Sequence, residues 1–233
     1  MNTIHDNLIA IKNEIEKIAS KCERDPNTIE LIAVSKTKPV QQIAEAINAG
    51  QFAFGENYVQ EGIEKIKYFK QIMPNRVLSW HFIGPLQSNK SKLVAEHFDW
   101  IHTIDRFKIA QRLNDQRPAD MMKLNVLIQV NISQEASKSG VAPEEVTDLI
   151  KQIIALPNLH LRGLMAIPEI ENDFDKQLNV FTKMQKLLYS LQADYPCMDT
   201  LSMGMSGDMQ AAIVAGSTMV RIGTAIFGAR HYL

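Results

Sequence analysis

Cysteine is scarce in this sequence, and there is no excess of charge of either sign. The two cysteines, Cys22 and Cys197, lie far apart and match no metal or redox spacing, so we expect no disulfide framework. The 25 lysines and arginines nearly balance the 26 aspartates and glutamates, which gives a formal net charge of −1. A chain with this balance has no overall field that would attract nucleic acid or an anionic membrane.

Long apolar runs are missing as well. No stretch approaches the roughly 18 residues that are needed to cross a bilayer. The polar, amphipathic beginning "MNTIHDNLIAIKNEIEKI" does not have the pattern of a secretory signal. We therefore expect a soluble protein of the cytoplasm.

Several catalytic motifs are absent too. No G-x-G-x-x-G follows the first apolar strand and no Walker motif occurs, which argues against dinucleotide-binding and P-loop proteins. No G-x-S-x-G of a serine hydrolase occurs. The six histidines include no H-x-x-x-H pair, so we do not expect a zinc enzyme.

What the sequence does contain is a regular alternation of strand-like and helix-like segments. A helix is predicted first, because Ile4, Leu8, Ile11, Ile15 and Ile18 recur at helical spacing. Eight strand candidates follow, with helical patterns between them, at residues 30–35, 52–54, 77–83, 98–103, 124–131, 159–166, 198–203 and 218–222. This number of βα units is typical of a TIM barrel, although an open doubly wound sheet alternates in the same way. We predict an α/β fold, a single-domain (β/α)8 barrel over residues 1–233 with an extra N-terminal helix.

Two loops near the end of the chain could hold a phosphate. In TIM barrels the loops after strands 7 and 8 often do so, and here they are "GMSGD", with Ser206, and "RIGTAIFG", with Gly223 and Thr224. Glycine lets the backbone approach an anion closely, and N–H groups at a helix start stabilise it. The same residues also suit ordinary caps and turns that need no ligand, so the pattern leaves both readings open.

Cationic residues within apolar strands are the other candidates. In "ELIAVSKTKP" the alternation places Val34 and Lys36 on one face, so Lys36 reaches the barrel mouth if that face is the interior. A desolvated lysine there can attack carbonyl groups, and an ordinary surface charge is the alternative. Lys38 precedes Pro39 and belongs to the turn before the next helix. Arg221 lies inside the eighth strand and requires either a ligand or a structural ion pair.

These segments together resemble a known family. "IAVSKTKP", "FGENYVQE", "WHFIGPLQSNK", "GLMAI" and "LSMGMSGDMQAAIVAGSTMVRIGTAIFG" are similar to the YggS/PROSC family of pyridoxal phosphate homeostasis proteins, over nearly the whole chain. The resemblance implies a barrel like the N-terminal domain of bacterial alanine racemase. It also implies pyridoxal 5′-phosphate (PLP) as the cofactor, carried on a lysine.

The resemblance assigns roles to the candidate residues. The cofactor-binding set that it implies is Lys36, Asn57, His81, Met203, Ser206, Arg221, Gly223 and Thr224. Lys36 would form a Schiff base with PLP, Ser206 would help to hold the phosphate, and Arg221 would face the pyridine nitrogen. Lys138, in "SKSG", would lie near the phenolic oxygen. Because arginine cannot accept the ring proton, the nitrogen would stay unprotonated and the ring would be a weaker electron sink.

The expected function is that of a PLP holder. Such a protein would control the intracellular supply of vitamin B6 and would deliver PLP to apo-enzymes, without turning over a substrate of its own. One alternative is a PLP-dependent enzyme such as a weak amino-acid racemase, although the tyrosine that the racemase takes from its second domain has no counterpart after this barrel. Another alternative is a Schiff-base lyase acting on a phosphorylated sugar. We expect a monomer.

Overall fold

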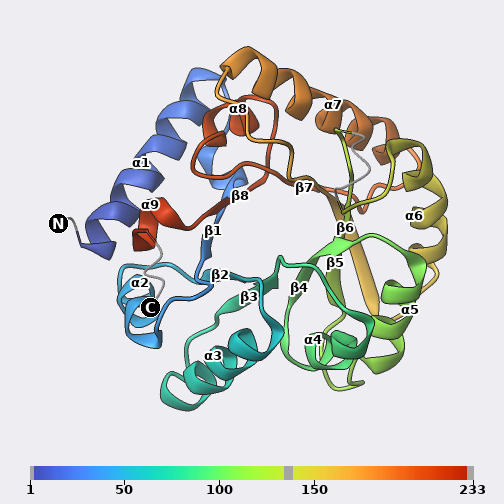
Figure 1. Ribbon diagram of the computed structural model, residues 1–233, viewed down its shortest axis with the longest axis horizontal. Coiled ribbons are helices and arrows are strands. Elements are labelled where there is room, and N and C mark those ends of the chain that lie inside the picture. Colours follow the sequence, from blue (N-terminus) through green and yellow to red (C-terminus); the bar gives the residue numbers. More distant parts are fainter. Residues whose placement is uncertain (1–2, 134–138, 230–233) are drawn as a thin grey trace.

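Eight parallel strands pair in sequence order and close into a barrel (Figure 1). The computed structural model describes residues 3–133 and 139–229. The strands are β1 (Glu30–Val34), β2 (Ala53–Glu56), β3 (Ser79–Phe82), β4 (Trp100–Ile104), β5 (Leu124–Gln129), β6 (Leu159–Met165), β7 (Thr200–Ser202) and β8 (Met219–Ile222). Pairing of β8 with β1 closes the barrel, so the predicted barrel is confirmed and the open doubly wound sheet is not.

Helices cover the outside of the barrel (Figure 1). They are α1 (Ile4–Lys21), α2 (Val40–Asn48), α3 (Val59–Ile72), α4 (Ser91–His97), α5 (Phe107–Gln116), α6 (Val146–Ile154), α7 (Phe174–Gln192), α8 (Met209–Val214) and α9 (Thr224–Phe227). Short 3-10 turns lie at Pro26–Thr28, Ser88–Lys90 and Pro143–Glu145. Across the described residues, no helix combines the length and the apolarity that spanning a membrane would require.

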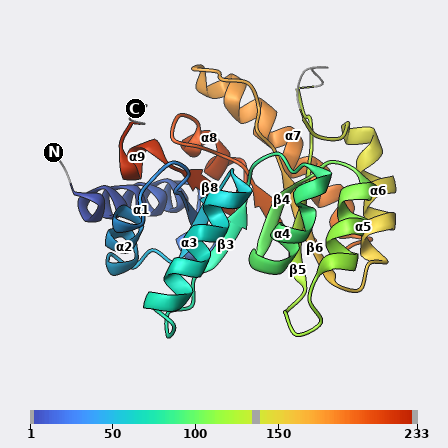
Figure 2. The ribbon, with the colours of Figure 1, turned by 60° about the horizontal axis from the view of Figure 1, so that its bottom comes forward.

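The extra helix α1 precedes the barrel, as predicted. Thr3 caps its start through a reciprocal pair of bonds with Asp6. Its apolar face, which includes Leu8 and Ile15, is buried. This face packs against α2, α8 and α9, and Figures 1 and 2 show α1 and α9 side by side. Segments from the beginning and the end of the described chain therefore meet on one side of the barrel.

Strand alternation divides the apolar core into two layers. The layer inside the barrel consists of Ile32, Ala53, Trp100, Leu127, Met165 and Met219. The other layer lies between strands and helices and includes Leu31 and Ala33 of β1. Because Ile32 faces inward, alternation places Val34 on the same interior face. The same alternation directs Lys36, which follows β1, toward the interior.

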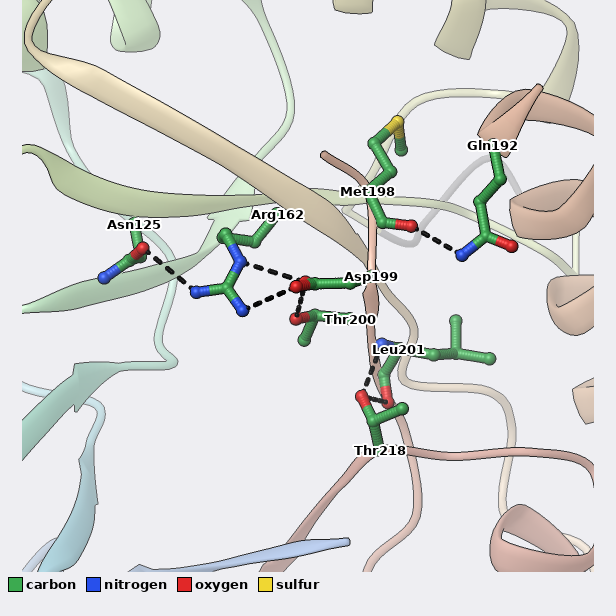
Figure 3. A network of polar contacts seen from close by, with 8 residues as sticks. All are labelled: Asn125, Arg162, Gln192, Met198, Asp199, Thr200, Leu201 and Thr218. Carbon is green, nitrogen blue, oxygen red and sulfur yellow. Dashed lines mark hydrogen bonds and ion pairs between the residues drawn. The ribbon is translucent and has the colours of Figure 1, made fainter. Parts of the chain in front are cut away.

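A polar network lies at the N-terminal ends of the strands (Figure 3). Arg162 on β6 donates from Nε and Nη2 to the two carboxylate oxygens of Asp199, at 2.9 and 2.8 Å. Its guanidinium carbon lies 5.0 Å from the ring centroid of Trp100, and Nη1 reaches Asn125 at 3.4 Å. The ion pair of Arg162 with Asp199 and the indole of Trp100 fill the end of the barrel where the strands begin. The end where the strands finish is therefore the mouth that could receive a ligand.

Candidate functional site

Lys36 follows β1 at the mouth of the barrel. Its neighbour Ser35 points outward, because the Ser35 hydroxyl donates to Glu56 in the layer beneath the helices, at 2.6 Å. Alternation therefore directs Lys36 inward, and its side chain is half-buried. The inward direction of Lys36 stays a prediction, whereas the surroundings of Lys38 are defined by its hydrogen bonds.

Lys38 lies in the turn before α2 and interacts with the end of α9. Its backbone N–H donates to Ser35, and Nζ lies 3.0–3.1 Å from the carbonyl oxygens of Phe227, Gly228 and Ala229. A cation beside the carbonyl end of a helix is a stabilising arrangement. Pro39 immediately precedes α2 and is its N-cap residue.

The two candidate anion loops leave adjacent strands. β7 pairs with β8, and the Arg221 N–H donates to the Gly204 carbonyl at 2.9 Å. Ser206 and Thr224 are exposed, and Gly223 is half-buried. First-turn N–H groups of a helix have no acceptor within that helix, so the starts of α8 and α9 offer donors at the mouth. Both helices are short, six and four residues, so these N–H groups and the hydroxyls matter more here than a helix dipole.

Asp208 occupies the end of the first of these loops. Its Oδ1 accepts the Met205 N–H at 2.6 Å. Burial raises the pKa of the Asp208 carboxyl, while the bond from Met205 and the charge of Arg221 oppose the increase. Asp208 thus holds the shape of the loop and leaves Ser206 at the surface.

Arg221 is a buried cation with neutral partners. It is 4 % exposed, and it donates from Nη1 to the Ser202 hydroxyl at 2.7 Å and from Nη2 to the Ala166 carbonyl at 3.0 Å. No carboxylate of the described residues lies within 4.0 Å of its guanidinium. Burial lowers the pKa of Arg221 to about 10 and Asp208 partly opposes this, so the side chain remains protonated at neutral pH. Its further donors can serve an acceptor on a ligand, such as an aromatic ring nitrogen.

A chain of hydrogen bonds runs from Arg221 across the barrel interior. Ser202 contacts His102 Nδ1 at 2.9 Å, His102 Nε2 contacts His81 Nδ1 at 3.0 Å, and His81 Nε2 contacts Ser79 at 2.9 Å. A guanidinium only donates, so Ser202 accepts from Arg221, and we assign the Ser202 hydroxyl as the donor to His102. We assign the remaining protons in the same direction, toward Ser79.

His81 and His102, the two histidines in this chain of hydrogen bonds, are neutral at ordinary pH. Burial lowers the pKa of His81 to about 3. Burial also lowers the pKa of His102 well below its usual value, and the neighbouring His81 and Arg221 act in the same direction. His81 stacks on the ring of Trp100 at a centroid distance of 5.4 Å. His81 thus lies fully buried below the mouth, and its predicted contact with a cofactor stays a prediction.

Asn57 and Met203 occupy different surroundings. Asn57 directly follows β2 and lines a cavity of about 330 Å³ at the mouth, together with Thr103 and Gln129. Its Oδ1 is buried and has no hydrogen-bond partner among the residues that the structure describes. The Met203 side chain belongs to the core between strands and helices, so it does not face the barrel interior. Lys138 lies outside the described residues.

Sequence reasoning missed the partners that surround these residues. His102 and Ser202 contact each other although they are 100 positions apart. Another missed group is Lys65, buried on the apolar face of α3. A lysine in the same helical stripe as Ile66 and Phe69 was the available signal, because a lone buried cation requires specific acceptors.

Comparisons with known proteins identify relatives of this chain. Residues 7–231 match the family described as alanine racemase, N-terminal domain. The chain is 61% identical over 232 residues to a pyridoxal phosphate homeostasis protein of Vibrio alginolyticus, with 100% of both chains covered. The structure of PipY from Synechococcus elongatus, with PLP bound, has 35% identity and a TM-score of 0.79, and the match covers 92% of this chain and 99% of that one.

A more distant similarity concerns the fold alone. Alanine racemase of Corynebacterium glutamicum has 16% identity and a TM-score of 0.70, and the match covers 97% of this chain and 61% of the racemase. The predicted likeness to the racemase barrel is therefore confirmed at the level of the fold.

Proposed function

The chain belongs to the YggS/PROSC family of pyridoxal phosphate homeostasis proteins, and from this membership we propose that it binds PLP at the barrel mouth and takes part in vitamin B6 homeostasis. The motifs predicted this family, and the relative from Vibrio alginolyticus is named a pyridoxal phosphate homeostasis protein. The relative PipY has a solved structure with PLP bound. The residues at the mouth of this chain suit the same cofactor.

The observation that carries the proposal is that a lysine follows one strand of the barrel and a buried arginine lies on the neighbouring strand. Lys36 follows β1, and Arg221 lies on β8 in register with Ile32, also of β1. PLP has an aldehyde that requires an amine and a ring nitrogen that accepts a hydrogen bond. Its phosphate requires N–H and O–H donors, which Ser206, Gly223 and Thr224 provide at the adjacent loops.

PLP would supply an aldehyde that condenses with a primary amine, forming a Schiff base and releasing one water. In this proposal Lys36 provides the amine, and its neutral form is the nucleophile. Arg221 donates to the ring nitrogen and, since it has no lone pair to take up a proton, keeps that nitrogen unprotonated. A ring in this state withdraws electrons poorly.

This arrangement favours holding the cofactor over using it. We propose that the protein turns over no substrate and instead releases PLP by exchange of Lys36 with other amines. Apo-enzymes that require PLP would be the recipients. In this proposal an incoming amine would enter through the cavity that Asn57 lines at the mouth.

The test is covalent trapping. Purified protein mixed with PLP should become yellow, and borohydride followed by peptide mapping should place the cofactor on Lys36. Lys36→Ala should lose the colour and the label, whereas Lys38→Ala, which changes the other lysine of the segment, should keep the label. A label on Lys38 in the wild-type protein would refute the assignment. Lys36-dependent exchange of amino-acid Cα protons with solvent at enzymatic rates would refute the role as a holder.

A further inference from the structure

A buried ionic cluster lies directly behind Lys36, on the outer side of the barrel wall. Its centre is Lys65 of α3, whose Nζ contacts the Ser35 carbonyl at 2.7 Å, Glu56 Oε1 at 2.8 Å and Glu61 Oε1 at 2.6 Å. The side chains of Lys65 and Glu56 are 5 % and 0 % exposed. Glu56 Oε1 also accepts the hydroxyl of Ser35.

The same cluster also binds the backbone of the residue that follows Lys36. Glu61 Oε1, which contacts Lys65, also accepts the backbone N–H of Thr37 at 2.6 Å. Thr37 has a φ of +62°, a conformation that β-branched residues adopt only when the surroundings impose it. The residues before and after Lys36 are thus both bonded to one cluster, through a carbonyl, a hydroxyl and an amide.

Stability alone does not account for this cluster. Glu56 and Lys65 are buried, while the Glu61 side chain is 28 % exposed. Burying a carboxylate and an ammonium has a desolvation cost that their attraction often fails to exceed. Desolvation raises the pKa of Glu56 despite the favourable charge of Lys65, and Glu56 Oε2 has no hydrogen-bond partner in the described part of the chain. An apolar pair at the interface of α3 with the barrel would avoid these costs, so the geometry of the backbone at residues 35–37 is the property that the cluster specifically provides.

We propose that Glu61 and Lys65 are positioning residues for the Lys36 amine. By holding the backbone at Ser35 and Thr37, they fix the direction in which the Lys36 side chain leaves the barrel wall and enters the mouth. Attack on a carbonyl requires the nitrogen lone pair to approach along a narrow path, and small misplacements are costly in rate. This inference rests on the proposed function, because it assigns Lys36 as the attacking amine.

Two variants of Glu61 separate the hydrogen bonds from the charge. Glu61→Gln retains the oxygen that accepts from both Thr37 and Lys65, whereas Glu61→Ala removes it. At saturating PLP, we expect the first-order rate of covalent attachment to fall about tenfold in Glu61→Ala and to stay within about twofold of wild type in Glu61→Gln. Stopped-flow absorbance measures this rate, and thermal unfolding of each variant is recorded beside it.

A second measurement distinguishes the amine from the rest of the pocket. Pyridoxine 5′-phosphate has the ring and the phosphate but no aldehyde, so its dissociation constant should be the same in wild type and Glu61→Ala. The double variant Glu61→Ala/Thr37→Gly should recover much of the lost rate, because glycine adopts a positive φ without the Cβ penalty. If Glu61→Ala does not fold, the double variant Lys65→Met/Glu56→Gln allows the same comparison, since it removes the buried cation together with the carboxylate that it would otherwise leave unpaired.

The outcomes are distinguishable from failure of the function itself. If the wild-type protein carries no label on Lys36, the proposed function fails and the inference with it. If Lys36 is labelled but Glu61→Ala attaches PLP at the wild-type rate, the inference alone is overturned. An equal loss of affinity for pyridoxine 5′-phosphate would also overturn it, because the cluster would then shape the pocket rather than aim the amine.

Discussion

Arg221 shows how a single residue imposes order on the barrel interior. Its guanidinium is buried and donates to a hydroxyl and a carbonyl, those of Ser202 and Ala166, rather than to a carboxylate. With the assigned direction, in which Ser202 accepts from Arg221 and donates to His102, the Nδ1 of His102 is an acceptor and carries no proton. The charge of Arg221 therefore disfavours protonation of His102, in addition to burial.

The buried, neutral His81 predicts that the free energy of unfolding decreases at acidic pH. The pKa of His81 is about 3 in the folded protein and about 6.5 in an unfolded chain. Below pH 6.5 the unfolded state binds a proton that the folded state does not, so the free energy of unfolding decreases as the pH falls toward 3. Between pH 7 and pH 5, we expect wild type to lose about 2 kcal/mol more than His81→Gln, measured by urea unfolding.

The control for this prediction is His5→Gln, on the exposed surface of α1. It should show the wild-type loss over the same pH range. If His81→Gln loses as much stability as wild type, then His81 is not the group that titrates, and a neutral buried His81 is the wrong description.

Alternation predicted individual residues well and could not predict their partners. The period of two along a strand placed Arg221 opposite to Val220 and Ile222, and Arg221 is buried in the structure. The chain from Ser202 through His102 to His81 joins three strands, and no local pattern encodes which side chains meet across a barrel. Likewise, Lys65 could be recognised as an unusual lysine on an apolar helix face, but not as the residue that contacts Ser35.

At the scale of elements, the strands were predicted in the right order and with imprecise ends. Residues 77–83 were expected where β3 covers Ser79–Phe82, and residues 198–203 where β7 covers Thr200–Ser202. The prediction followed apolar runs, which report burial, whereas a strand ends where its ladder of hydrogen bonds ends. Met203 is an example, because it is fully buried yet lies beyond β7.

The irregularity in β6 was also beyond the sequence pattern, and it yields a second prediction. The register between β5 and β6 shifts next to Gly163, which has a φ of +153°. A Cβ at this position would overlap the carbonyl oxygen of Thr200 on β7. Gly163→Ala should therefore lower the free energy of unfolding by about 3 kcal/mol, measured by urea unfolding.

Gly50 is the matched control for this prediction. It also has a positive φ, +80°, but a Cβ there would meet nothing within 4 Å. Gly50→Ala should cost about 1 kcal/mol, from backbone strain alone. Equal losses in the two variants would mean that the contact between β6 and β7 at Gly163 is not close enough to exclude a side chain.

At the scale of the whole molecule, α1 connects the first part of the chain to the two candidate anion loops near its end. Arg24, just after α1, donates from Nη1 to the Ile213 carbonyl at 2.6 Å and from Nη2 to the Ser217 carbonyl at 2.8 Å. Asn7 donates to the Ile226 carbonyl at 2.9 Å. These bonds hold the C-terminal ends of α8 and α9, the helices whose first turns follow Ser206 and Gly223.

Removing this attachment should loosen the anion loops without touching them. Arg24→Met keeps much of the apolar stem but loses both charge-assisted bonds, and we expect it to lower the free energy of unfolding by about 2 kcal/mol. Amide hydrogen exchange in α8 should accelerate more than in α5 on the far side of the barrel, and the dissociation constant for pyridoxine 5′-phosphate should rise. Lys17→Met, on the exposed face of α1, should stay within about 0.5 kcal/mol of wild type. If exchange in α8 and α5 accelerates equally, Arg24 contributes only to global stability, and α1 does not hold the loops in place.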